Sequence, residues 1–169
     1  MDKPVIRKKV CMLGAYAVGK TSLVQRFVKD IFSEHYQTTV GVKITKKELE
    51  LDGVEMSLLL WDLHGDDEFQ TVRDSYLQGA SGALLVADGT RPATIDQAVK
   101  LRARLHAIAG EVPSCLLLNK SDLEDSWEVT EERLRNAGFA PEEAITTSAK
   151  TGNGVEAAFL QIARRMTEG

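Results

Sequence analysis

The residues with the clearest chemical meaning form a glycine-bounded loop near the N-terminus. The segment Gly14-Ala15-Tyr16-Ala17-Val18-Gly19-Lys20-Thr21 matches the pattern G-x-x-x-x-G-K-[ST] at every fixed position. It lies between an apolar, strand-like run and a helical pattern, where backbone N–H groups and the positive end of a helix dipole bind phosphate. We expect Lys20 to place its charge between the terminal phosphates, and the Thr21 hydroxyl to ligate Mg²⁺. The alternative is an ordinary glycine-containing turn from strand to helix.

A second polar motif, Asn119-Lys120-Ser121-Asp122, follows the apolar run Cys115 to Leu118. On its own this motif is also typical of a solvated turn. In an open α/β sheet, however, ligands bind in the crevice outside the carboxyl ends of the strands. The Asp122 carboxylate can accept hydrogen bonds from N1–H and the 2-amino group of guanine, which adenine does not offer. With a backbone N–H from Ser148-Ala149-Lys150 for the guanine carbonyl, the motifs favour guanine over adenine.

A third segment, Trp61-Asp62-Leu63-His64-Gly65, ends an extended apolar run. We expect Asp62 to hold Mg²⁺, directly or through a water molecule. Gly65 would let a backbone N–H approach the γ-phosphate closely, because glycine has no side chain in the way. Without the other two motifs, this segment would indicate only a strand that ends in an ordinary turn.

Hydrophobic periodicity indicates the elements that must position these motifs. Strands are expected at Val10–Leu13, Val42–Leu51, Val54–Trp61, Gly82–Ala87, Ser114–Leu118 and Ala144–Thr147. Helices are expected at Lys20–Val28, Ala93–Ala109, Thr130–Asn136 and Val155–Met166. The alternation predicts one α/β domain over residues 1–169, with a mixed, mostly parallel six-stranded sheet flanked by about five helices. Together with the phosphate-loop motif, it predicts the P-loop NTPase fold. Asp52-Gly53 predicts the hairpin that makes the sheet mixed.

The composition excludes several classes of protein. The chain has 169 residues, a formal net charge of −4 and 43% hydrophobic residues, which excludes wholesale disorder and a nucleic-acid partner bound through a basic surface. Cys11 and Cys115 both lie in apolar runs, which predicts buried free thiols in a reducing compartment. Apolar runs far shorter than about 20 residues, no signal-peptide pattern and no C-terminal cysteine for prenylation predict a cytoplasmic protein without a direct lipid anchor.

With these motifs in this order, the chain resembles the Ras superfamily of small GTPases, and its pattern is similar to the Rab branch. The resemblance runs from Lys9 to about Arg165, and five segments carry it: Gly14–Thr21, Thr39–Gly41, Trp61–Gly65, Asn119–Asp122 and Thr147–Lys150. It implies a molecular switch that binds GTP and GDP with Mg²⁺ and hydrolyses GTP. Two switch loops, approximately His35 to Lys43 and His64 to Tyr76, would bind protein effectors and regulators in one nucleotide state.

The resemblance also implies roles for single residues. Thr39 matches the switch threonine that ligates Mg²⁺ and contacts the γ-phosphate. Phe32 matches the aromatic residue that packs against the guanine base, and Lys120 and Lys150 match residues that flank it. The second switch matches the Rab pattern at Phe69, Tyr76, Gly79 and Ala80. Trp61 and Tyr76 match two of the three aromatic effector positions. Ile44 occupies the third, where the family usually has phenylalanine.

Two positions depart from the family pattern. Asp66 stands where a glutamine usually follows the glycine matched by Gly65. A glutamine amide both accepts from the attacking water and donates to the γ-phosphate, whereas an ionised aspartate cannot donate and adds negative charge, so we expect slow hydrolysis. The alternative is that Asp66 accepts a proton as a base.

Tyr16 is the second departure and replaces a small residue. It is expected to block a partner's arginine or to hydrogen-bond the γ-phosphate; the alternative is a solvated side chain with no effect. His64 is expected to be a surface residue rather than a catalytic histidine.

The candidate residues form three sets. The catalytic set is Lys20, Thr39, Gly65 and Asp66. The nucleotide-binding set is Gly14, Ala15, Tyr16, Ala17, Val18, Gly19, Lys20, Thr21, Ser22, Phe32, Asn119, Lys120, Asp122, Ser148, Ala149 and Lys150. The metal set is Thr21, Thr39 and Asp62. The alternatives to a slow GTPase switch are a GTP/GDP-binding module with negligible turnover and an ATP-dependent phosphotransferase.

Overall fold

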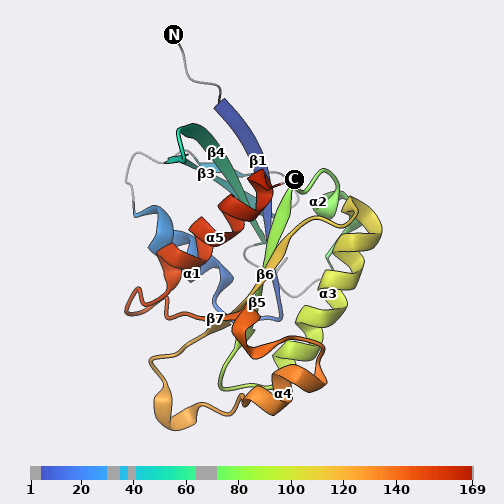
Figure 1. The fold of residues 1–169 in the computed structure, drawn as a ribbon, viewed down its shortest axis with the longest axis vertical. Coiled ribbons are helices and arrows are strands. Elements are labelled where there is room, and N and C mark those ends of the chain that lie inside the picture. Colours follow the sequence, from blue (N-terminus) through green and yellow to red (C-terminus); the bar gives the residue numbers. More distant parts are fainter. Residues whose placement is uncertain (1–4, 30–34, 38–40, 64–71, 169) are drawn as a thin grey trace.

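The computed structural model describes residues 5–29, 35–37, 41–63 and 72–168, which form a single sheet with helices on both faces (Figure 1). The strands are β1 (Val5–Gly14), β2 (His35–Gln37), β3 (Val42–Leu51), β4 (Val54–Leu63), β5 (Gly82–Asp88), β6 (Ser114–Asn119) and β7 (Ala144–Thr146). The helices are α1 (Lys20–Val28), α2 (Asp74–Leu77), α3 (Ala93–Ala109), α4 (Glu131–Asn136) and α5 (Val155–Thr167), with short 3₁₀ turns η2 (Glu124–Ser126) and η3 (Pro141–Glu143).

The sheet confirms the predicted α/β architecture. Its strand order is β2-β3-β4-β1-β5-β6-β7, and β4, β1, β5, β6 and β7 run parallel. The predicted hairpin joins β3 to β4, with φ of 51° at Asp52 and 80° at Gly53, as a tight hairpin turn requires. The described sheet has seven strands rather than the predicted six, because β2 adds an antiparallel edge strand. Three residues are too few to show a period of two in a sequence.

Two hydrophobic clusters fix the helices to the two faces. On one face, Val10 and Met12 of β1 pack with residues of α1 and α5, where the rings of Phe27 and Phe159 stack with centroids 4.2 Å apart. On the other face, Cys11 and Leu13 pack with residues of α2, α3 and α4. Every residue of β5 is buried, as expected for a central parallel strand covered on both faces. The resulting rigid strands hold the loops at their carboxyl ends.

Both cysteines are buried free thiols, as predicted. Burial raises the pKa of Cys11 to about 12 and also raises the pKa of Cys115, so both thiols are poor nucleophiles. Within the part of the chain that the structure describes, none of the helices has the length and apolar character needed to cross a bilayer.

Candidate functional site

The loop that follows β1 needs glycine at both of its ends. A Cβ on Gly14 would lie 2.4 Å from the carbonyl oxygen of Val86 on the neighbouring strand β5. At the other end Gly19 has a φ of +101°, and a Cβ there would lie 2.3 Å from Nδ2 of Asn119. Packing therefore requires both fixed glycines of the motif, and the chain passes from Gly19 directly into α1.

The ammonium group of Lys20 is held against the first part of this loop. The residue is 2% exposed, and its Nζ donates to the carbonyl oxygens of Gly14 (3.1 Å) and Ala15 (3.0 Å). A buried ammonium is costly unless its protons are hydrogen-bonded, and these two carbonyls meet part of that demand. The arrangement places a fixed positive charge at the start of α1, beside the N–H groups of the first helical turn, which the helix's own backbone bonds do not use.

Two oxygen ligands suited to Mg²⁺ lie together next to Lys20. The Thr21 hydroxyl donates to Oδ2 of Asp62 at 2.5 Å, and Asp62 itself is 2% exposed at the end of β4. Hydroxyl and carboxylate oxygens are hard ligands, and Mg²⁺ commonly binds one or two carboxylates together with phosphate oxygens and water. The described residues contain no group of three or more His, Cys, Asp or Glu side chains that could hold a metal. A hydroxyl and one carboxylate are a donor set that fits Mg²⁺ when phosphate oxygens and water supply the other ligands.

Asn119 joins the phosphate loop to the loops after β6 and β7. Its Nδ2 donates to the carbonyl oxygen of Val18 at 2.9 Å. Its Oδ1 accepts from the Thr147 hydroxyl at 3.1 Å and from the Ala149 N–H at 3.3 Å. Asn119 is 2% exposed, so these bonds are protected from water. The sequence predicted a ligand-binding residue here, and the structure shows that its amide also holds three loops in one arrangement.

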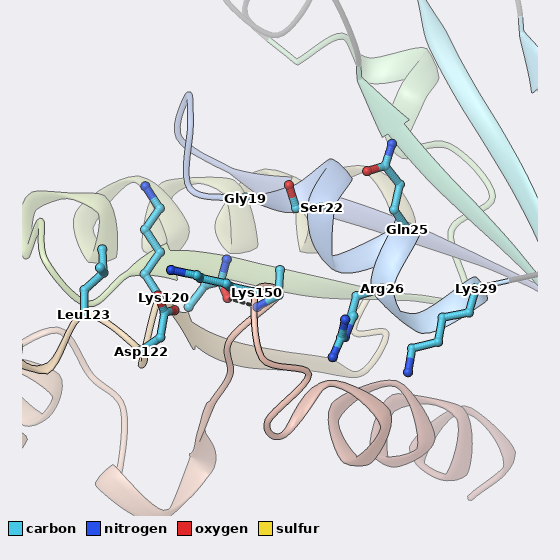
Figure 2. Close-up of a pocket in the computed structure, with 11 residues that line it drawn as sticks. Gly19, Ser22, Gln25, Arg26, Lys29, Lys120, Asp122, Leu123 and Lys150 are labelled. Atoms are coloured by element: carbon cyan, nitrogen blue, oxygen red, sulfur yellow. Dashed lines mark hydrogen bonds between the residues drawn. The ribbon is translucent and has the colours of Figure 1, made fainter.

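Asp122 lies in a cavity of about 640 Å³ beside this junction. Its Oδ1 accepts from the Ser148 hydroxyl at 2.8 Å, and the Ser148 Oγ in turn accepts from the Thr151 N–H at 3.1 Å. Figure 2 shows Asp122 and Lys120 on one side of the cavity and the α1 side chains on the other. The described lining residues are Gly19, Ser22, Gln25, Arg26, Lys29, Asn119, Lys120, Asp122, Leu123, Ala149 and Lys150. This volume is typical of a site for a small molecule.

The buried carboxylate of Asp88, at the end of β5, organises the neighbouring loops. Its Oδ1 accepts from the Thr90 N–H (2.8 Å) and the Thr90 hydroxyl (2.7 Å), and its Oδ2 accepts from Lys120 Nζ (2.9 Å) and Arg91 Nε (3.0 Å). Burial acts to raise the pKa of Asp88, but the hydrogen bonds from Thr90, Lys120 and Arg91 outweigh it and lower the pKa to about 2. Asp88 therefore stays ionised and fixes the end of the Lys120 side chain.

Asp88 and Arg91 were missed by the sequence analysis. Asp88 directly follows the run Gly82–Ala87, so the rule that placed Asn119 at the carboxyl end of a strand would also have indicated Asp88, with Arg91 three residues further on. Arg91 also donates from Nη2 to the carbonyl oxygen of Tyr16, at 2.8 Å. The Tyr16 residue is 49% exposed, so its side chain lies at the surface of the phosphate loop.

The predicted site residues that the structure describes lie at the carboxyl edge of the parallel strands, in the loops after β1, β6 and β7 and at the end of β4. These are Gly14–Ser22, Asp62, Asn119, Lys120, Asp122 and Ser148–Lys150. Six other residues with a predicted role lie outside the described residues: Phe32, Thr39, His64, Gly65, Asp66 and Phe69.

Of the three predicted effector positions, Tyr76 is mainly structural. It is 3% exposed, and its hydroxyl lies 2.5 Å from the carbonyl oxygen of Trp61 and 3.0 Å from that of Met12. The Trp61 ring meets the Tyr76 ring edge-on at 6.2 Å, and Lys9 Nζ lies 3.6 Å from the Trp61 ring centroid. Trp61 and Ile44 are only partly buried, so they are the members of this trio that can contact a partner.

Comparison with known proteins gives one consistent result. The sequence pattern of the Ras family matches residues 9–168. The chain is 36% identical over 168 residues to Ras-related protein Rab-7L1 of Rattus norvegicus, a match that covers 94% of this chain and 81% of the relative. It is 34% identical over 165 residues to Ras-related protein RABF2b of Arabidopsis thaliana, a match that covers 95% of this chain and 82% of the relative. It is 33% identical over 158 residues to Ras-related protein Rab-8B of Pongo abelii, a match that covers 92% of this chain and 76% of the relative.

Proposed function

Because this chain belongs to the Ras family and is a Rab-like, GTP-binding small GTPase, we propose that it works as a slow, magnesium-dependent guanine-nucleotide switch. One observation carries the assignment of the site. From the end of β6, Asn119 bonds the phosphate loop at Val18 and the loop after β7 at Thr147 and Ala149. A phosphate cradle and a purine pocket are thereby held at a fixed separation, as a nucleotide requires.

The phosphate side of the site would bind and polarise the polyphosphate. Lys20, held by the carbonyls of Gly14 and Ala15, would place its charge on the terminal phosphates and stabilise the charge that develops when water attacks the γ-phosphate. Thr21 and Asp62, with Thr39 from the sequence prediction, would hold Mg²⁺. When bound, the metal would neutralise phosphate charge and fix the geometry of the phosphates.

The base side of the site would select guanine. Asp122 lines the cavity, and the hydrogen bond from the Ser148 hydroxyl to its Oδ1 limits rotation of the carboxylate. Guanine offers two donors on that edge, whereas adenine offers a lone pair and leaves the carboxylate unpaired. A site built on such pairing rejects the wrong base by roughly 10⁴-fold. Lys120, fixed by Asp88, and Lys150 would line the flat faces of the base.

Slow turnover is inferred from Asp66, which lies outside the described residues. Its carboxylate cannot donate to the γ-phosphate as a glutamine amide does, and its charge opposes the approach of a polyanion. Tyr16, whose residue is 49% exposed on the phosphate loop, would in addition obstruct an arginine supplied by a partner. Such an arginine accelerates hydrolysis by about 10³–10⁵-fold.

Single-turnover hydrolysis of GTP tests this function. The purified chain is loaded with radiolabelled GTP and Mg²⁺, and the phosphate released is followed for several hours beside Asp66→Gln. We expect slow but complete conversion to GDP, with a faster rate in the variant. GTP that stays intact in the parent would instead support a nucleotide-binding module without turnover. Turnover of ATP at the same rate would contradict the guanine switch.

A further inference from the structure

Arg91 has an arrangement that the proposed site does not yet use. Its guanidinium spans two loops: Nε donates to Oδ2 of Asp88 at 3.0 Å, and Nη2 donates to the carbonyl oxygen of Tyr16 at 2.8 Å. The Arg91 side chain is 44% exposed, but the carboxylate that anchors it is 1% exposed and also holds Lys120. A planar guanidinium can make both bonds at once in a fixed geometry, which a lysine ammonium cannot.

The carbonyl that Arg91 holds belongs to the peptide that leads into a strained residue. Ala17 has a φ of +62°, in the left-handed region that a side chain disfavours and that glycine adopts freely. The described residues contain no cis peptide bond, so the Ala17 N–H points away from the Tyr16 carbonyl and hence away from Arg91. Successive residues that alternate between right- and left-handed conformations direct their N–H groups into an anion-binding concavity.

We propose that Arg91 is a positioning residue for the phosphate loop: by holding the Tyr16 carbonyl it keeps Ala17 in the left-handed conformation and directs the Ala17 N–H to a nucleotide phosphate. This proposal rests on the phosphate-binding role of the loop proposed above. Asp88 anchors Arg91 and Lys120 through the same oxygen atom, so the phosphate loop and the base-side loop share one fixed support. Binding then does not have to include the cost of bending Ala17 into a strained conformation.

The proposal predicts that Arg91 matters because residue 17 is alanine. Without the guanidinium, the Tyr16–Ala17 peptide can rotate and Ala17 can relax, so nucleotide binding must restore the strained conformation. A glycine at position 17 has no such strain and should make Arg91 largely dispensable. The effects of the two substitutions on nucleotide binding should therefore be strongly non-additive, as expected for residues that act through the same backbone conformation.

A double-mutant cycle on GDP dissociation tests this. The variants are Arg91→Met, Ala17→Gly and the double variant, with Arg104→Met as a matched control, since Arg104 pairs with Asp74 at 2.8 Å at a distance from the loop. The dissociation of a fluorescent GDP analogue is measured by chase with excess GDP in the presence of Mg²⁺. Arg91→Lys is included as a conservative variant, and thermal unfolding of each protein shows that it is folded.

We expect Arg91→Met to accelerate dissociation about tenfold in the parent, which is the effect of losing one charge-assisted hydrogen bond, and about twofold in the Ala17→Gly background. Arg91→Lys should be close to Arg91→Met, and Arg104→Met should match the parent. An unchanged rate in Arg91→Met, or the same acceleration in both backgrounds, would overturn the positioning role of Arg91 while GDP binding by the parent stands. A parent that takes up no GDP would overturn the proposed function itself.

Discussion

Replacing one carboxylate oxygen of Asp122 by an NH₂ group should change the base that the site selects. In Asp122→Asn the remaining carbonyl oxygen can still accept from the Ser148 hydroxyl, which the carboxylate does at 2.8 Å. The new NH₂ group then takes the place of Oδ2 and presents a donor where the parent presents an acceptor. Of the two donors on this edge of guanine, the one that faced Oδ2 now meets another donor and its pairing is lost, whereas xanthine has a carbonyl at position 2 that accepts from the new donor.

The expected magnitude follows from the bonds that change. Each hydrogen bond to the ionised carboxylate contributes about 1.5–3 kcal/mol, and a neutral one about 1 kcal/mol, so the loss of one bond and the weakening of the other should weaken GDP binding by about 10–10³-fold. The binding of xanthosine diphosphate should improve by about tenfold or more, since one repulsive contact becomes a hydrogen bond. Displacement of a fluorescent GDP analogue by GDP, xanthosine diphosphate and ADP measures all three affinities on one protein.

Asp125→Asn is the matched control for this exchange. Asp125 lies in the exposed turn η2, three residues beyond Asp122, and is not part of the cavity lining. The Asp125→Asn substitution removes the same charge and should leave the affinities for GDP, xanthosine diphosphate and ADP within about twofold of the parent, as is usual for an exposed surface site. If Asp122→Asn binds GDP within threefold of the parent, or if Asp125→Asn weakens it equally, the assignment of Asp122 as the base-selecting residue is wrong.

Three further changes should have measurable effects. Asp66→Gln should raise the single-turnover rate of GTP hydrolysis by about tenfold or more, because the amide can donate to the γ-phosphate; a rate equal to or below that of the parent would refute the account of this position. Gly89→Ala should lower the free energy of unfolding in urea by about 1–3 kcal/mol, since its Cβ would lie 1.9 Å from Cζ3 of Trp127, and a change below about 0.5 kcal/mol would mean that the ring moves freely. The pKa of Asp88 is lowered to about 2 from an ordinary value of 3.8, so the stabilisation by this carboxylate is present at neutral pH and is lost as the pH falls from about 4 to 2. Asp88→Asn should remove that part of the acid dependence, and an unchanged pH profile of the unfolding midpoint would contradict the pairing with Lys120 and Arg91.

The local signals in the sequence predicted several elements well. The helix predicted at Thr130–Asn136 is α4, and Thr130 is its N-cap, with a hydroxyl that accepts from the Arg133 N–H at 3.1 Å. The helix predicted at Ala93–Ala109 is α3 with the same bounds, and it ends at Gly110, its C-cap, with a φ of 86°. Both features depend on residues close together in the chain, which is why a single sequence shows them.

Features that depend on pairing between distant segments were predicted less well. The run Val10–Leu13 predicted only the buried half of β1, which starts at Val5 because its charged first residues pair in parallel with Glu55–Leu59 of β4. That outer half is only partly buried, so it carries no apolar pattern. The four-residue helix α2 was likewise too short to show a helical period.

The candidate site shows the same division. Motif spacing predicted which loops gather at the carboxyl edge of the sheet. It did not show that the amide of Asn119 is used to join those loops, or that Asp88 and Arg91 connect two of them. The contacts that join different loops are distant in sequence: Asn119 and Thr147 are 28 residues apart, and Arg91 and the Tyr16 carbonyl are 75 residues apart, so no local pattern reports them. Tyr76 is a related case, because only the fold shows that it is buried.

The most direct measurement is the identity of the nucleotide that the purified chain retains through gel filtration in Mg²⁺ and releases on denaturation. Chromatography of the released material reports the base and the number of phosphates together. The account predicts close to one equivalent of GDP or GTP per chain, and loss of most of it after incubation with EDTA. Adenine nucleotide in its place, or a chain that retains no guanine nucleotide and takes up none when GDP and Mg²⁺ are supplied, would contradict it.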